Sequence, residues 1–233
     1  RVQMEFTAGT VDTKTSINDL EVLWSAGDAI SVFDGTNNNR FDLTGGEGTK
    51  SATFSGLAET VSEYVALYPY SANASFADNT ITATLPVEQY STVGGSFDTM
   101  LNPAVAKSSD NTLTFRNIAG LIRINVTNVP EGLGIREIQA KAATSLTGEY
   151  TVNTSGDDFE AVASGSEING VRLVAKDGGE LAAGSYNLVV LPGEYANFKV
   201  TVILTDGSYI AKGGDETSPT ATIPANGGIN ITI

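Results

Sequence analysis

The chain of 233 residues contains neither cysteine nor histidine. Without cysteine it has no disulfide and no thiolate nucleophile, and it lacks the ligand on which most structural zinc sites depend. Without histidine, Ser-His-Asp and Cys-His catalysis are excluded, as are imidazole metal sites. The enzymatic chemistry that remains open rests on carboxylate pairs or on lysine and tyrosine side chains.

The sequence also lacks any apolar run as long as the roughly 18–20 residues of a membrane-spanning helix. No secretory signal peptide is visible, and the first residue is Arg1 rather than methionine, so we expect a processed chain. The absence of cysteine does not by itself assign the chain to the cytosol.

Basic residues are few: 13 lysines and arginines stand against 27 aspartates and glutamates, for a net charge of −14. Such a chain repels the phosphate backbone of nucleic acids and anionic lipid headgroups, so neither is an expected partner. The acidic residues are scattered rather than gathered in one block, which favours a solvated surface over an ion-binding function.

What the sequence does contain is short alternating apolar runs separated by turn residues. The clearest is 198–204, where Phe198, Val200, Val202 and Leu204 alternate with other residues. The stretch DGTNNN at 34–39 has the Asp-Gly and Asn residues that tight hairpin turns need. No long segment has helical apolar spacing, so the pattern predicts an all-β, mainly antiparallel fold with little helix.

The length fits one large β domain or two of roughly 100 residues each. Residues 102–111 are polar and show no clear periodicity. We therefore predict a boundary there, with an N-terminal domain at 1–105 and a C-terminal domain at 106–233.

Five motifs follow one another in the first half of the chain. They are Trp24-x-x-Gly27-Asp28-x-Ile30-x-Val32, Ala52-x-Phe54-x-Gly56, Tyr64-x-Ala66-x-Tyr68-Pro69-Tyr70, Leu85-Pro86-x-x-Gln89 and Leu113-x-Phe115-x-Asn117. Their order and spacing resemble the fimbrillin-like proteins of Bacteroides and its relatives, a group of fimbrial subunits, anchors and surface lipoproteins. The motif match runs from about Val2 to Val126, and the second half resembles the family in texture only.

The resemblance implies two transthyretin-like antiparallel β-sandwich domains in tandem. It also implies a non-catalytic protein without cofactors, exported as an outer-membrane lipoprotein whose lipid-bearing cysteine is not in this chain. The implied role is that of a fimbrial subunit or a fimbria-associated adhesin. The implied partners are other fimbrial subunits, and receptors or glycans on host or bacterial surfaces.

In polymerising members of the family, a protease cuts after a basic residue and removes the first strand, and a neighbouring subunit then donates a strand to the exposed groove. The resemblance places Val2, Met4 and Phe6 on the displaced strand. Lys14 is the only basic residue between that strand and Trp24, so it is the candidate cleavage site. The family pattern has arginine there, and an ordinary loop lysine is the alternative.

The final residues, GINITI at 228–233, alternate apolar and polar side chains. Ile229, Ile231 and Ile233 suit a donor strand and suit the last core strand of the chain's own domain equally well, and we favour the second.

The aromatic residues allow two interpretations. Trp24, Tyr68 and Tyr70 could form a sugar-stacking platform, and a surface carbohydrate-binding lipoprotein is the alternative function. The apolar neighbours of Trp24 favour a buried tryptophan in a β-sandwich core, and Tyr70 remains the candidate surface aromatic. Gly27-Asp28 is interpreted as a turn in which the aspartate bonds nearby backbone N–H groups.

Other candidate sites are weaker. No spacing pairs the carboxylates Asp28, Asp98, Glu137 and Glu149 as a glycosidase requires. Asp157-Asp158 and Asp215-Glu216 do not fit the EF-hand pattern for calcium. Asp98-Thr99-Met100 resembles the short acceptor motif for O-glycosylation in this bacterial group, which makes Thr99 a candidate modified residue.

Overall fold

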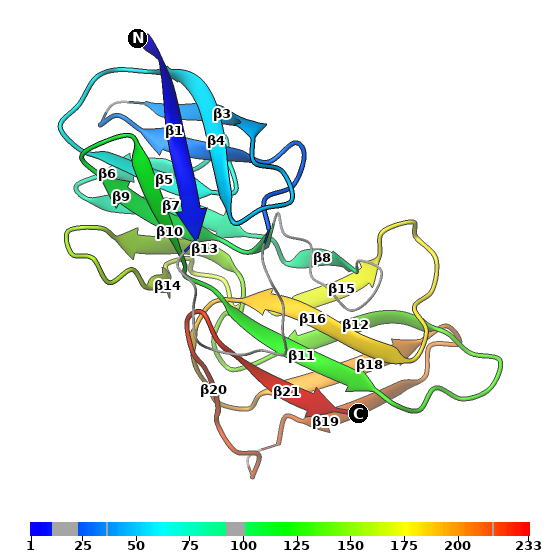
Figure 1. Ribbon diagram of the computed structural model, residues 1–233. Coiled ribbons are helices and arrows are strands. Elements are labelled where there is room, and N and C mark those ends of the chain that lie inside the picture. Colours follow the sequence, from blue (N-terminus) through cyan, green and yellow to red (C-terminus); the bar gives the residue numbers. More distant parts are fainter. Residues whose placement is uncertain (11–22, 36, 92–100, 216) are drawn as a thin grey trace. The chain divides into compact units, whose positions relative to one another are not determined.

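The computed structural model describes residues 1–10, 23–35, 37–91, 101–215 and 217–233 (Figure 1). Lys14 and Thr99 lie outside these residues. Across the described ranges the chain forms 21 β-strands and no α-helix, which confirms the all-β prediction. No helix in these ranges has the length and apolarity to cross a membrane.

The chain divides into two compact units, and each draws on three segments. Unit 1 comprises 1–84, 102–118 and 150–162, and unit 2 comprises 85–101, 119–149 and 163–233. The predicted division into 1–105 and 106–233 does not coincide with these units.

The predicted boundary between residues 105 and 106 falls inside a strand, β9 (Ala104–Ser108). Ala104, Val105 and Ala106 are all at most 3% exposed, so β9 is buried on both faces. A strand buried on both faces has no apolar–polar alternation, and for this reason the pattern did not indicate a strand.

Unit 1 is built around a closed barrel of seven strands in the order β1-β10-β9-β5-β2-β3-β4. The other barrel strands are β1 (Val2–Thr10), β2 (Ala29–Phe33), β3 (Asn38–Gly45), β4 (Ser51–Ala58), β5 (Tyr64–Tyr68) and β10 (Thr112–Asn117). The DGTNNN stretch joins β2 to β3 as an antiparallel hairpin, as predicted, with Gly35 at φ +82°. The barrel interior is aromatic, with Phe6, Phe41, Phe54 and Phe115 at most 1% exposed.

A four-stranded sheet in the order β14-β13-β7-β6 completes unit 1. Its strands are β6 (Ser75–Ala77), β7 (Thr80–Leu85), β13 (Gly148–Asn153) and β14 (Ala161–Ala163), the last three crossing the limits of the unit. The ring of Phe76 in β6 lies 5.5 Å from that of Phe33 in β2. The β2–β5 part of the barrel wall is therefore buried on its outer side too, and all five residues of β2 and of β5 are buried.

Unit 2 contains two sheets around one apolar core. One has the order β16-β11-β21, the other β19-β18-β12-β15-β8, and a short β17-β20 pair accompanies them. The core takes Ile122 and Leu188 from the first sheet and Ile138, Leu173 and Val202 from the second. The strands are β8 (Glu88–Ser91), β11 (Gly120–Val126), β12 (Ile135–Lys141), β15 (Val171–Ala175), β16 (Gly184–Val190), β17 (Gly193–Tyr195), β18 (Lys199–Leu204), β19 (Tyr209–Gly213), β20 (Ala221–Ile223) and β21 (Gly228–Thr232).

A buried side chain links the two sheets of unit 2. Gln89 of β8 is 1% exposed, and its amide donates to the carbonyl of Val189 at 2.7 Å and accepts from the N–H of Val189 at 2.9 Å. The Gln89 amide thus pairs with the backbone of β16 much as a neighbouring strand would, which satisfies backbone groups at that edge.

Candidate functional site

The first strand closes the barrel. It runs antiparallel to β4, from Val2 opposite Ala58 to Gly9 opposite Ser51, and parallel to β10 from Thr7 opposite Thr112 onward. The Val2–Phe6 part of β1 has registered pairs on the β4 side only, apart from a hydrogen bond of 2.9 Å from the Asn111 amide to the Glu5 carbonyl. The N-terminal half of β1 is therefore more weakly held than its C-terminal half.

The side chains of β1 enter the barrel to increasing depth along the strand. Val2 is 50% exposed, Met4 packs against the edge of the core, and Phe6 is fully buried. The Phe6 ring makes edge-to-face contacts with Phe41 and Tyr64 at centroid distances of 5.4 and 5.0 Å. Phe6 is therefore the main apolar contribution of this strand to the barrel interior.

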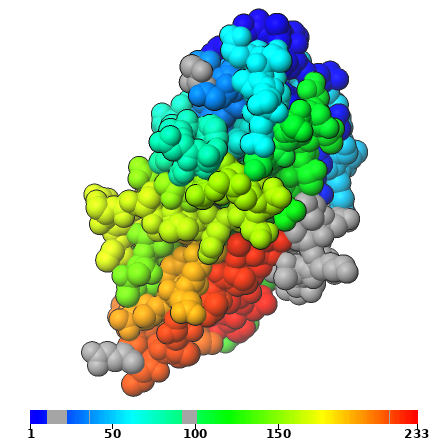
Figure 2. Space-filling model, turned by 90° about the vertical axis from the view of Figure 1, so that its left-hand side faces the viewer, coloured from blue at the N-terminus to red at the C-terminus, as the bar shows by residue number. Residues whose placement is uncertain are grey.

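The outer side of β1 is polar and faces solvent. Figure 2 shows the dark-blue residues of β1 at the surface of unit 1 beside the cyan residues of β4. On this side the Gln3 amide donates to the Ser55 hydroxyl at 2.6 Å. In the described part of unit 1, Gln3 and Glu5 on this side of β1 are exposed.

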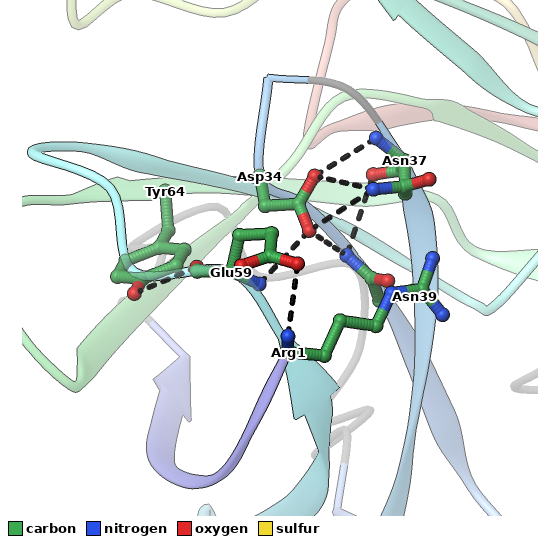
Figure 3. A network of polar contacts seen from close by, with 6 residues as sticks. All are labelled: Arg1, Asp34, Asn37, Asn39, Glu59 and Tyr64. Atoms are coloured by element: carbon green, nitrogen blue, oxygen red, sulfur yellow. Dashed lines mark hydrogen bonds and ion pairs between the residues drawn. The ribbon is translucent and has the colours of Figure 1, made fainter.

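A polar network lies at the start of β1 (Figure 3). The amino group of Arg1 is 2.9 Å from a carboxylate oxygen of Glu59. The buried carboxylate of Asp34 accepts from the amide of Asn39 at 2.8 Å and from the N–H groups of Asn37 and Glu59 at 2.8 and 3.0 Å. The Arg1–Glu59 pair is exposed and contributes at most about 1 kcal/mol, so the fixed part of the network is Asp34 and its partners.

This network was not predicted as a site. The DGTNNN stretch predicts Asp34 and Asn39 as turn residues; Asp34 lies in the turn, whereas Asn39 lies in β3 opposite Val32. Asp34 also joins the β2–β3 hairpin to the end of β4 through the Glu59 N–H. The Asn-rich turn was the only sequence signal, since Glu59 lies 25 residues further along the chain.

The C-terminal strand β21 lies in the chain's own unit 2. It runs parallel to β11, with Ile229 opposite Ile122 and Ile231 opposite Ile124. Ile229, Ile231 and Ile233 are partly buried against the unit 2 core. In this structure they occupy the last-strand position.

Trp24 lies in the barrel core. It is 5% exposed and makes edge-to-face contacts with Phe54, Tyr68 and Phe115 at centroid distances of 5.0, 5.2 and 5.8 Å. A cavity of about 10 Å³ beside it is large enough for no more than a water molecule. Trp24 and Tyr68 are thus unavailable for stacking against a sugar.

Tyr70 is half-buried and follows the cis Tyr68–Pro69 peptide. The guanidinium of Arg40 lies 5.0 Å from the centre of its ring. Because Arg40 occupies one face of this ring, Tyr70 makes a poor platform for a sugar.

Asp28 is 2% exposed at the Gly27-Asp28 turn, where Gly27 has φ +84°. One carboxylate oxygen accepts from the Ser25 N–H at 2.7 Å, as the turn interpretation predicted, and the other accepts from the Tyr68 hydroxyl at 3.1 Å. Burial raises the pKa of Asp28 above its ordinary 3.8, against the opposing effect of these two hydrogen bonds. Its charged form is therefore disfavoured by folding, and its role is structural.

Asp28→Asn is expected to alter the pH dependence of stability. Because the folded pKa is raised, the wild-type chain loses stability as pH rises from 3.8 through that raised pKa. An asparagine side chain can accept from the Ser25 N–H and donate to the Tyr68 hydroxyl without carrying a charge. The stability of the variant relative to wild type should therefore increase across this pH range. Urea unfolding from pH 3 to 7 measures the difference.

Asp28→Ala is the matched control. It leaves the Tyr68 hydroxyl and the Ser25 N–H without their partner, so it should be less stable than Asp28→Asn by about 1–3 kcal/mol at every pH, because neither variant carries the titrating carboxylate. A constant difference between Asp28→Asn and wild type over the whole pH range would contradict the assignment.

Two of the other candidate carboxylates have partners of their own in the described residues. Glu137 pairs with Arg136 and Arg172 at 3.7 and 3.9 Å in unit 2, and Glu149 accepts from the Ser164 hydroxyl. Asp98 and Glu216 lie outside the described ranges. Within those ranges no group of three acidic side chains gathers in a way that could hold a metal ion.

Comparison with solved structures identifies related folds. A candidate cell adhesion protein of Bacteroides ovatus superposes with a TM-score of 0.61 at 15% identity, covering 100% of this chain and 93% of that protein. A second, from Bacteroides uniformis, gives a TM-score of 0.56 at 17% identity, covering 99% and 92%. This chain shares their fold. No protein-family model and no curated protein sequence matches it.

Both neighbours come from Bacteroides, the genus of the fimbrillin-like proteins that the five motifs resemble. The structural comparison therefore agrees with the resemblance drawn from the sequence. At identities of 15% and 17% the agreement concerns the fold alone.

Proposed function

We propose that this chain is a non-catalytic cell-surface adhesion protein, acting as a fimbrial subunit or fimbria-associated adhesin, whose first strand is exchangeable. The observation that carries the proposal is the position of β1 in the barrel. This strand is peripheral in sequence, solvent-accessible on its outer side, and paired on one side only along Val2–Phe6. The names of the two structural neighbours, both candidate cell adhesion proteins, support a role in adhesion.

Removing β1 would create an acceptor groove between β4 and β10. Eight registered positions of β4, from Ser51 to Ala58, would lose their partner strand, and the rings of Phe41 and Tyr64 would lose the Phe6 ring. A strand from another subunit with alternating apolar side chains would restore both the backbone pairing and the buried ring. The proposed partners are therefore other fimbrial subunits.

The chain's own C-terminal strand is a poor donor. Its alternation fits the groove, yet it already pairs with β11 and packs on the unit 2 core. We propose that it acts as the last strand of its own domain.

The same proposal includes two further features. The paired sheets of unit 2 around one core support a transthyretin-like sandwich there, and the barrel of unit 1 would be a closed variant of it. A surface location, with an outer-membrane lipid anchor outside this chain, follows from the family resemblance. The alternative of a glycan-binding lipoprotein centred on Tyr70 is disfavoured because Arg40 covers that ring.

Limited digestion with a Lys/Arg-specific protease, followed by unheated denaturing electrophoresis, tests the proposal. Cleavage at Lys14 and a ladder of detergent-resistant multimers are expected, and Lys14→Gln should abolish both. A chain trimmed at Lys14 that stays strictly monomeric would rule out the polymerising role, as would a ladder that forms equally well in Lys14→Gln.

A further inference from the structure

The outer face of the five-stranded sheet in unit 2 carries one row of side chains across all five strands. Tyr209 of β19 pairs with Ile203 of β18, and Ile203 with Glu137 of β12. On the other side of β12, Ile138 pairs with Leu173 of the antiparallel strand β15, so the preceding residue Glu137 lies beside Val174. Val174 in turn pairs with Tyr90 of β8. The alternate residues Ile138, Leu173 and Val202 point into the core, so this row points outward.

An exposed tyrosine stands at each end of this row. Tyr209 is 66% exposed and Tyr90 38%, so both rings are accessible to solvent. Four interstrand steps separate them, or about 19 Å. The Tyr90 hydroxyl donates to Glu88 at 2.7 Å, two residues earlier on the same strand, which fixes the direction of that ring.

Between the two tyrosines the face carries hydrogen-bonding side chains with equal numbers of positive and negative charges. Arg172 pairs with Glu88 at 2.5 Å and with Glu137 at 3.9 Å, and Arg136 pairs with Glu137 at 3.7 Å. Two guanidinium groups thus balance two carboxylates in a chain whose net charge is −14. Gln139 and Thr201, which pair with each other across β12 and β18, add neutral polar groups.

The charges and side-chain types on this face indicate which class of ligand it can bind. A nucleic acid or another polyanion would meet the carboxylates of Glu88 and Glu137, and the core of a protein interface is depleted of glutamate. A neutral ligand rich in hydroxyl groups can bond to both guanidinium and carboxylate without leaving either charge unpaired. Tyrosine presents an apolar ring and a polar tip, which suits a ligand with C–H faces and hydroxyls.

We propose that this face, from Tyr209 to Tyr90, binds a neutral polysaccharide laid across the strands. The two rings contact sugar rings at the ends, and the Arg172–Glu88 and Glu137 groups bond hydroxyls between them. The proposal does not depend on exchange of β1, which belongs to unit 1, so either can fail alone.

Affinity electrophoresis of the whole chain in native gels tests the proposal. The gels contain a soluble β-glucan, xylan or mannan, with polygalacturonate as the acidic comparison. We expect at least one neutral polysaccharide to retard the wild-type chain, and Tyr209→Ala with Tyr90→Ala to weaken that binding about tenfold. Tyr70→Ala, in unit 1, is the matched control and should bind like wild type.

Several results would overturn the proposal. They are no retardation by any of the three neutral polysaccharides, retardation by polygalacturonate alone, and unchanged binding by the double variant. Since both tyrosines are exposed, the double variant should keep its melting temperature, and a melting curve of each protein accompanies the gels. Loss of binding in Tyr70→Ala and not in the double variant would place the site in unit 1 instead.

Discussion

Phe6→Ala should destabilise unit 1 by about 3–5 kcal/mol, the usual cost of truncating a buried phenylalanine. The Phe6 side chain is fully buried, and its ring touches those of Phe41 and Tyr64, so alanine leaves a cavity that the closed barrel cannot readily collapse. Trp24, the only tryptophan, lies in the same core. Urea unfolding followed by its fluorescence therefore reports on unit 1.

Val2→Ala is the control on the same strand and the same face. Val2 is 50% exposed, so this change should cost less than about 0.5 kcal/mol. If the two variants unfold at the same urea concentration, β1 does not hold the barrel through Phe6, and the acceptor groove would lack its main pocket.

Deleting residues 1–10 is expected to have the larger effect and to abolish cooperative unfolding of unit 1. The deletion leaves eight registered positions of β4 without a partner on the β1 side and removes the buried side chains of Phe6 and Ala8. Exposed backbone pairing groups beside an apolar groove also promote association, so we expect multimers or aggregates. Trp24 fluorescence and size-exclusion chromatography measure these effects.

A synthetic peptide of residues 2–10, added in excess to the deleted chain, should restore the native Trp24 emission. The same peptide with Phe6→Asp should not, because it would bury a charge against Phe41 and Tyr64. Equal rescue by both peptides would mean that backbone pairing alone fills the groove. A deleted chain that unfolds like the full one would contradict strand exchange altogether.

The aromatic residues of the motifs show which features the sequence predicts and which it does not. The burial of Trp24 followed from its apolar neighbours, and the turn at Asp28 from the Gly-Asp pair. The Tyr68–Asp28 bond joins residues 40 positions apart, and no local pattern encodes such a contact. The contact of Arg40 with one face of the Tyr70 ring likewise depends on β3 meeting the segment that follows β5.

Alternation and turn residues determined the all-β class, most strand positions and the inward face of β1, because a strand's period of two is a local property. The tertiary structure alone decided that seven strands close into a barrel, that β9 crosses the predicted boundary, and that β21 pairs with β11. It alone also placed Tyr90 and Tyr209 on one row. Strand order and register depend on pairings between residues as much as 107 positions apart, whose free energy comes from burial in a common core rather than from neighbours in the chain.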